Sequence, residues 1–128
     1  MDWMDLAGVR SVTPWAARPS YVEGVDRPVP LLSLTGDPDR TNTEEIVTRW
    51  IGFNECDTDP QVDDLGSDVW RRTYQNCAAD ILYFDIQGAP HCFFLHEATG
   101  PAAGWICEYE EVDYLEEAYQ FFAEHPLP

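Results

Sequence analysis

The sequence predicts an α/β fold that forms the second half of a sheet with flanking helices. Residues 80–86 are a nearly continuous run of strand formers with little polar surface on either face, which is typical of a strand covered on both sides. Residues 29–34 form a shorter apolar run. Residues 42–54 and 114–122 repeat apolar side chains every three to four positions, as amphipathic helices do. The order strand, helix, strand pair, loop and helix is that of the second half of an α/β sheet.

The length of 128 residues, 45% of them hydrophobic, suffices for one domain with a modest core. Residues 1–26 contain Pro14, Pro19 and Gly24 among scattered apolar side chains, so we expect an irregular N-terminal segment there and the domain at 27–128. The acidic N-terminus lacks the charged-then-apolar pattern of a secretion signal. The sequence therefore indicates no export signal, and the localisation stays open.

The chain is strongly acidic, with a net charge of −17 from 24 acidic and 7 basic residues, and every basic residue is arginine. Such a surface repels phosphate groups, so we expect no nucleic-acid partner. It also repels anionic lipids, and no apolar run has the length of a membrane span, so we expect no membrane association.

The strand expected at 29–34 ends at Thr35-Gly36, and the loop Gly36–Arg40 follows with two carboxylates, Asp37 and Asp39. Asp and Pro favour turns, so a solvated turn is the simplest interpretation of this loop. Thr41 and Glu44 form a T-x-x-E capping box, which predicts that the helix begins there.

Residues 56–68 form an acidic stretch, and residues 57–68 have the length of an EF-hand calcium-binding loop. An EF-hand is excluded because its sixth position, which must be glycine, is Val62, and its twelfth is Asp68 instead of glutamate. We expect a solvated loop here. Residues 69–74 alternate loosely, which predicts an edge strand that pairs as a hairpin with residues 80–86.

His91 follows the central strand and the turn Gly88-Ala89-Pro90. Open α/β sheets carry their chemistry on loops at the carboxyl ends of strands, which makes His91 a candidate general base; a histidine that only bonds a loop carbonyl is the plainer alternative. His91, Cys92, His96 and Cys107 match no zinc-site spacing. The sequence therefore indicates neither a metal nor a cofactor.

Four ordered segments, RPVPLLSLTGDPD, TRWIGFNECD, RRTYQNCAADILYFDIQGAPH and YQFFAEHPLP, resemble the C-terminal part of the polyhydroxybutyrate depolymerase and feruloyl esterase group of α/β-hydrolases. The resemblance covers residues 27–128 and implies a carboxylic ester hydrolase. It implies that Asp39 is the triad aspartate, with Asp37 as the competing choice, and that His91 is the triad histidine. It also implies a disulfide between Cys56 and Cys77, which would need an oxidising compartment; proteins of this group are often secreted.

The resemblance lacks one part of the triad, because no serine of this chain lies in a G-x-S-x-G elbow. The nucleophile of an active enzyme is then a water, Cys92, Ser11, Ser20 or a serine of another chain. Cys92 is a poor choice, since neighbouring side chains in extended structure diverge.

Two functions are therefore weighed. The first is hydrolysis of a small ester, with Asp39 within about 3 Å of His91 as an acid–base pair. The alternative is a catalytically incomplete fragment that acts as a small acidic interaction domain. We expect a homo-oligomer, because half a sheet would expose apolar surface at 29–34 or 81–86.

Overall fold

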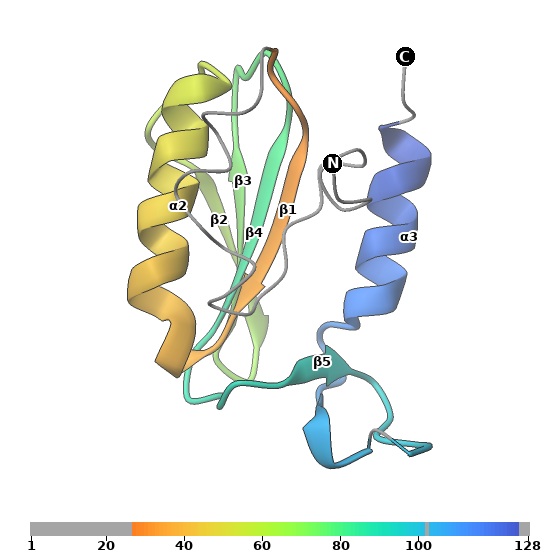
Figure 1. Cartoon of the computed structure of the whole chain (residues 1–128). Helices are drawn as coiled ribbons and strands as arrows, with labels where there is room; N and C mark the ends of the chain where they lie inside the picture. Colours follow the sequence, from red (N-terminus) through yellow and green to blue (C-terminus); the bar gives the residue numbers. More distant parts are fainter. Residues whose placement is uncertain (1–26, 102, 126–128) are drawn as a thin grey trace.

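A computed structural model describes residues 27–101 and 103–125, so the segment predicted to be irregular, 1–26, lies outside the described part. A four-stranded sheet stands between two helices (Figure 1). The helix α2 (Arg40–Phe53) covers one face and α3 (Tyr114–Glu124) lies against the other. The predicted α/β class is confirmed in this coarse sense.

The sheet has the strand order β1-β4-β3-β2. The strands β1 (Leu31–Thr35) and β4 (Ile81–Ile86) are parallel neighbours, while β3 (Val69–Tyr74) and β2 (Gln61–Gly66) continue the sheet in antiparallel fashion. Because β1 and β4 are parallel and in register, their carboxyl ends lie at the same edge of the sheet. This edge receives the two loops that carry Asp39 and His91.

The hairpin of β3 with β4 is confirmed, but the prediction that β3 is an edge strand is wrong. The segment expected to be a solvated loop contains β2, which pairs along β3 and takes the edge. The acidic composition of β2 is compatible with a strand because Asp63 stands opposite Arg71, and their side chains form an ion pair of 3.2 Å.

The helix α2 begins two residues earlier than expected and without the predicted capping box. A short 3-10 turn, η2 (Asp37–Asp39), leads directly into Arg40, and no side chain caps the helix. The threonine that matters is Thr43, which is buried and shares a hydrogen bond of 3.2 Å with the Thr35 hydroxyl. A contact with the strand, instead of a local cap, therefore ties the first turns of α2 to β1.

Apolar side chains fill both spaces between sheet and helices. The exposed fractions of Leu31, Leu34, Ile81 and Phe84 are 1% or less, so the prediction that β1 or β4 exposes apolar surface is wrong. The α2 side is buried around Trp50 and the α3 side around Phe121. The two buried clusters contain Leu31, Ile46, Val47, Trp50, Ile81 and Tyr83 on the α2 side, and Leu32, Leu34, Val69, Phe84, Ile86, Ala89, Cys92, Phe94, Val112, Ala118 and Phe121 on the α3 side.

Two three-residue strands that the sequence did not predict, β5 (Phe93–Leu95) and β6 (Ile106–Glu108), pair in parallel between the sheet and the start of α3. The short turn η3 (Ala103–Trp105) precedes β6. A disulfide between Cys92 and Cys107 joins the beginning of β5 to β6. None of the helices in 27–101 and 103–125 has the length and apolar character needed to cross a bilayer.

The disulfide between Cys56 and Cys77 that the resemblance implied is present. It lies at the opposite end of the sheet from the loops of Asp39 and His91. Next to it, the fully buried Asn54 accepts a hydrogen bond from Val29 N (3.3 Å) and donates to the carbonyls of Val29 (2.8 Å) and Ala79 (3.2 Å). This side chain thus joins the end of α2 to the starts of β1 and β4.

Candidate acid–base site

The predicted contact between Asp39 and His91 is present. The Oδ2 atom of Asp39 lies 2.8 Å from Nδ1 of His91, although the residues are 52 positions apart in the chain. An ionised carboxylate can only accept, so Nδ1 carries the proton and donates it to Asp39. This bond selects the tautomer of the imidazole that carries its proton on Nδ1 instead of Nε2.

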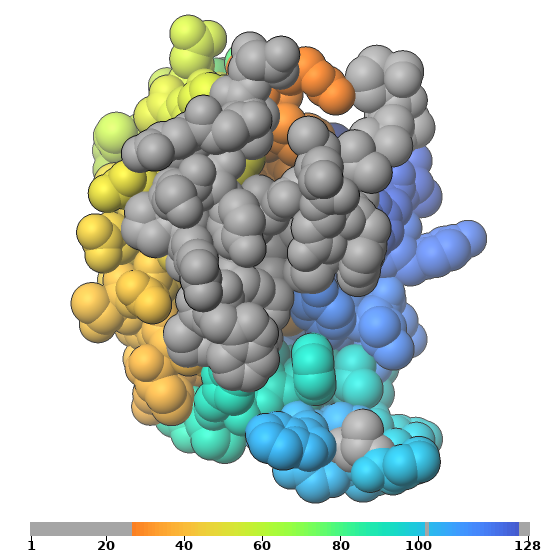
Figure 2. Space-filling view, in the orientation of Figure 1, coloured from red at the N-terminus to blue at the C-terminus, as the bar shows by residue number. Residues whose placement is uncertain are grey.

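The pair is placed by the parallel strands β1 and β4. Asp39 follows β1 by a turn of 3-10 helix, and His91 follows β4 by the turn at Gly88. In the space-filling view, the segment after β4 and the β5–β6 segment, in teal and light blue, gather at one end of the molecule beside the beginnings of α2 and α3 (Figure 2). The site therefore lies at the carboxyl edge of the parallel strand pair, where ligand sites of α/β sheets are found.

The two residues differ in burial in a way that suits an acid–base pair. The Asp39 side chain is 2% exposed, while that of His91 is 27% exposed. The Oδ1 atom of Asp39 is buried and has no hydrogen-bond partner in the described part of the chain. Since a buried carboxylate is costly without compensation, the hydrogen bond from Nδ1 of His91 to Oδ2 offsets part of the cost of burying Asp39.

The two loops meet through backbone as well as side chains. Gly36 lies so close to the second loop that a Cβ there would be 2.7 Å from the carbonyl oxygens of both Ala89 and Pro90. The next residue, Asp37, donates its N–H to Ala89 O at 2.8 Å. Glycine is needed at position 36 for space, because its φ of −100° is accessible to any residue.

Asp37 is not the partner of His91 but a link between the loops. Its Oδ1 accepts the N–H of Gly88 at 2.9 Å and pairs with Nη1 of Arg40 at 2.6 Å. The Gly88 N–H, with Arg40 as the lesser cause, lowers the pKa of Asp37 below its ordinary value. The alternative pairing of Asp37 with His91, which the sequence left open, is thereby excluded in favour of Asp39–His91.

Arg40 extends this link to the strand. Its Nε and Nη2 atoms donate to Oδ1 of the buried Asp85 at 3.0 and 2.8 Å, and Nη2 of Arg72 lies 3.3 Å from Oδ2 of Asp85. Asp85 is the second-last residue of β4, between the buried Phe84 and Ile86, and is 1% exposed. A charge buried this deeply requires pairing, and the two arginines provide it.

Cys92 is ruled out as a nucleophile in this structure, because its sulfur is bonded to Cys107. The same bond removes both cysteines from the metal cluster considered at His91 and His96. Ser11 and Ser20, the other candidate nucleophiles, lie outside the described residues. Of the described serines, Ser33 is buried in β1 and Ser67 bonds Glu111.

The other two histidines have their own partners. His96 shares a 2.7 Å hydrogen bond with Tyr109 O and lies 3.2 Å from Glu116, and this backbone bond is the main cause of the raised pKa of His96. His125 lies at the end of α3 and contacts Asp80 at 2.8 Å. Neither contacts the Asp39–His91 pair.

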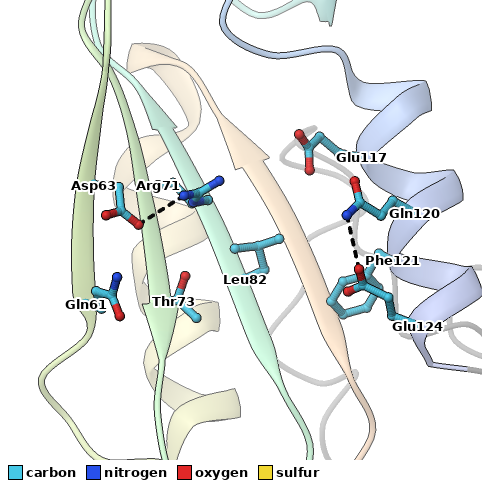
Figure 3. Close-up of a pocket in the computed structure, with 9 residues that line it drawn as sticks. All are labelled: Gln61, Asp63, Arg71, Thr73, Leu82, Glu117, Gln120, Phe121 and Glu124. Atoms are coloured by element: carbon cyan, nitrogen blue, oxygen red, sulfur yellow. Dashed lines mark hydrogen bonds and ion pairs between the residues drawn. The ribbon is translucent and has the colours of Figure 1, made fainter.

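A groove of about 370 Å³ lies between α3 and the β2–β3 hairpin (Figure 3). Its walls are polar: Asp63 and Arg71 pair on one side, and Gln120 bonds Glu124 on the other, with Phe121 nearby. Asp39 and His91 do not line this groove. The groove is therefore separate in space from the Asp39–His91 pair.

No known protein-family model matches this chain, and no curated protein matches it either. What the fold and the geometry define is a coarse class: an α/β domain with an aspartate–histidine pair at the carboxyl edge of two parallel strands.

Three residues that support the site were not predicted from the sequence: Gly36, Arg40 and Asp85. The signal for Asp85 was available, because a lone carboxylate in an otherwise apolar strand needs a cationic partner. Arg40 and Arg72 were then candidates among only seven basic residues. No local pattern marks Gly36, since its role arises from a loop more than fifty residues away.

Proposed function

We propose that this chain carries the acid–base pair of a carboxylic ester hydrolase, with His91 as general base and acid and Asp39 as its orienting carboxylate. The single observation that carries the proposal is the 2.8 Å contact between Asp39 and His91 at the carboxyl edge of β1 and β4. The likeness of four ordered sequence segments to the polyhydroxybutyrate depolymerase and feruloyl esterase group supports the choice of reaction.

The chemistry follows from the tautomer. Nε2 of His91 takes a proton from the attacking hydroxyl group as the new carbon–oxygen bond forms, and the imidazolium then gives that proton to the departing alkoxide. Asp39 stays ionised throughout and stabilises the imidazolium. Because the His91 side chain is partly exposed and the Asp39 side chain is buried, a substrate would contact the histidine and not the aspartate.

The attacking hydroxyl belongs to a water, to Ser11 or Ser20, or to a serine of another chain. Catalysis by the pair with a water as nucleophile requires no further side chain, but it lacks the gain from a covalent intermediate. We expect slow turnover of activated esters by this chain alone. A partner that supplies a serine and oxyanion donors would raise the rate by orders of magnitude.

The charge of the protein restricts the substrate. With a net charge of −17, the molecule repels anionic compounds at long range. We therefore expect uncharged esters to react and esters with carboxylate or phosphate groups to react poorly at low salt.

Hydrolysis of p-nitrophenyl butyrate tests the proposal. His91→Ala should lower kcat/KM by about a hundredfold or more, in the range of general base catalysis. Asp39→Asn should lower it as well, because the amide favours the wrong tautomer. A wild-type rate in His91→Ala would overturn the proposal, and so would the lack of any hydrolysis above the buffer rate by the wild-type protein.

Free imidazole cleaves activated aryl esters, so the loss of any histidine needs a control. His96→Gln removes an imidazole that is more exposed than His91 and contacts Tyr109 and Glu116 instead of Asp39. Its hydrolysis rate should stay at the wild-type value. Equal losses in His91→Ala and His96→Gln would assign the reaction to surface imidazole.

The second candidate function is that of a small acidic interaction domain without catalysis. Exposed apolar side chains favour it: Trp105, Leu115 and Tyr119 are 65%, 63% and 78% exposed. Such side chains are covered when a partner or a second copy binds. A homo-oligomer in light scattering at moderate salt, together with no effect of His91→Ala on hydrolysis, would favour this function over the first; a monomer would count against it.

A further inference from the structure

We propose that Asp37 and Arg40 are positioning residues that hold the His91 loop against the Asp39 loop. This inference rests on the proposed function for its effect on catalysis, whereas its structural effect can be measured without any turnover. Neither residue contacts the reacting atoms, so their action on the reaction goes through the Asp39–His91 pair.

The first observation is that Asp37 bonds the His91 loop twice. Its backbone N–H donates to Ala89 O, and its Oδ1 accepts from Gly88 N. Both bonds lie within three residues of His91 in the chain. A shift of this loop by 1 Å is enough to break the 2.8 Å contact between Asp39 and His91.

The second observation is that Arg40 joins the same carboxylate to the strand. Nη1 binds Asp37, and Nε and Nη2 bind the buried Asp85 at the end of β4. The His91 loop begins directly after this strand. Asp85 therefore anchors the start of the His91 loop, and Asp37 holds its middle. Only the branched guanidinium of an arginine can bind both carboxylates at once.

The third observation concerns Asp39 itself. Arg40 is the next residue in the chain, and a guanidinium is a strong partner for a carboxylate. Here Nε, Nη1 and Nη2 of Arg40 all bind Asp37 or Asp85. In the described part of the chain, His91 is the side chain that bonds the Asp39 carboxylate. The engagement of Arg40 by Asp37 thus reserves Asp39 for the histidine.

Asparagine and alanine at position 37 separate the two roles of the carboxylate. Asp37→Asn keeps an oxygen that accepts the Gly88 N–H but removes the charge that pairs with Arg40. Asp37→Ala removes both. The backbone bond from position 37 to Ala89 is retained by either variant, which favours folding of both.

The experiment is solution NMR on the full chain. The Nδ1 proton of His91 should give a low-field resonance in the wild type because it lies between a nitrogen and a carboxylate. In Asp37→Ala this resonance should disappear, and amide hydrogen exchange at Gly88 should become at least about tenfold faster. In Asp37→Asn the resonance should persist with faster exchange of its proton.

Asp63→Ala is the matched control, since it also removes an aspartate of an ion pair with arginine, but in the groove beside α3. It should leave the His91 resonance and Gly88 exchange unchanged. Arg40→Lys is the second variant in case Asp37→Ala does not fold; it keeps a cation but cannot bridge two carboxylates, so the resonance should weaken. Wild-type spectra in both Asp37→Ala and Arg40→Lys would overturn the inference.

The kinetic result expected for p-nitrophenyl butyrate is a fall in kcat of about tenfold or more in Asp37→Ala with KM unchanged, because a positioning residue affects the reacting geometry and not the binding of substrate. Failure of the two proposals can be told apart. If the wild-type protein shows the His91 resonance but no hydrolysis, the proposed hydrolase function is wrong. The positioning role of Asp37 and Arg40 is then decided by the NMR comparison alone. A wild-type protein without the resonance contradicts the acid–base pair itself.

Discussion

Gly36 and Ala89 approach each other so closely that no side chain fits between them. A Cβ built on Gly36 would lie 2.7 Å from Ala89 O, well inside the range that real contacts avoid. Gly36 directly follows β1, and Ala89 is buried in the turn before His91. The distance between the two loops, and with it the Asp39–His91 contact, therefore depends on the lack of a side chain at position 36.

Gly36→Ala should accordingly destabilise the protein by about 3 kcal/mol, because backbone atoms on both sides must move. Urea denaturation measures the free energy of unfolding. Gly52→Ala is the matched control: a Cβ at this exposed helical glycine meets nothing within 4 Å, so we expect a gain of about 0.5–1 kcal/mol. Equal stability of Gly36→Ala and the wild type would show that the loops lie farther apart than described.

The two disulfides should differ in their effect on the site although their effects on stability are similar. They close segments with sequence separations of 21 and 15, so each contributes about 3 kcal/mol to the free energy of unfolding. Cys92 adjoins His91 in the chain, whereas Cys56 and Cys77 lie at the far end of the sheet. We expect the double variant Cys92→Ser/Cys107→Ser to broaden the His91 Nδ1 proton resonance.

The double variant Cys56→Ser/Cys77→Ser should leave that resonance sharp while it lowers the midpoint of thermal unfolding to a similar degree. The comparison separates loss of local order at His91 from loss of overall stability. If both variants broaden the resonance equally, the bond beside His91 has no special part in holding the loop.

Glu117 should make the protein less stable at neutral pH than in mild acid. Burial, the largest cause, raises the pKa of this carboxyl above its ordinary value of 4.5. The folded state then holds the proton more tightly than the unfolded state, so stability falls as the pH rises from about 4.5 through the folded pKa. Glu117→Gln should therefore raise the midpoint of urea unfolding at pH 7 and remove this part of the pH dependence.

The control for that variant is Glu45→Gln, which removes one negative charge from an exposed position on α2. It reports the general gain from a less negative surface, which any acidic residue of this chain provides to some degree. A midpoint shift at pH 7 that is no larger for Glu117→Gln than for Glu45→Gln would show that the burial of Glu117 costs nothing.

The sequence predicted those parts of the fold that depend on local pattern. Continuous apolar runs predicted β1 and β4, and apolar side chains at helical spacing predicted α2 and α3. The strand β2 was missed because four aspartates and Pro60 lie in residues 57–64, and its stability as a strand comes from pairing with Arg71 and its neighbours across the hairpin. The strands β5 and β6, with three residues each, are too short for an alternating pattern to be visible.

The Asp39–His91 pair could be predicted from the sequence, whereas the residues that hold the two loops together could not. Asp39 and His91 each follow a buried parallel strand, so topology alone brings them to one edge. The choice between Asp37 and Asp39 depended on a turn of 3-10 helix that no propensity specifies, since either carboxylate follows the strand closely. The Cys92–Cys107 bond likewise depends on the pairing of β5 with β6, which is a tertiary contact.

Asn54 helps to fix the register of β1 against β4. It binds the backbones of Val29 and Ala79 and so fixes the starting points of two strands whose other ends are fixed by Gly36 and Asp37. A slip of β1 against β4 by one residue would move one loop by about 3.3 Å and turn each side chain of the slipped strand to the opposite face. Asp39 and His91 would then no longer meet, and Asn54 would lose its carbonyl partners at the other end. The acid–base contact is thus formed in one alignment of the strands only, and misaligned molecules would be identifiable by its absence.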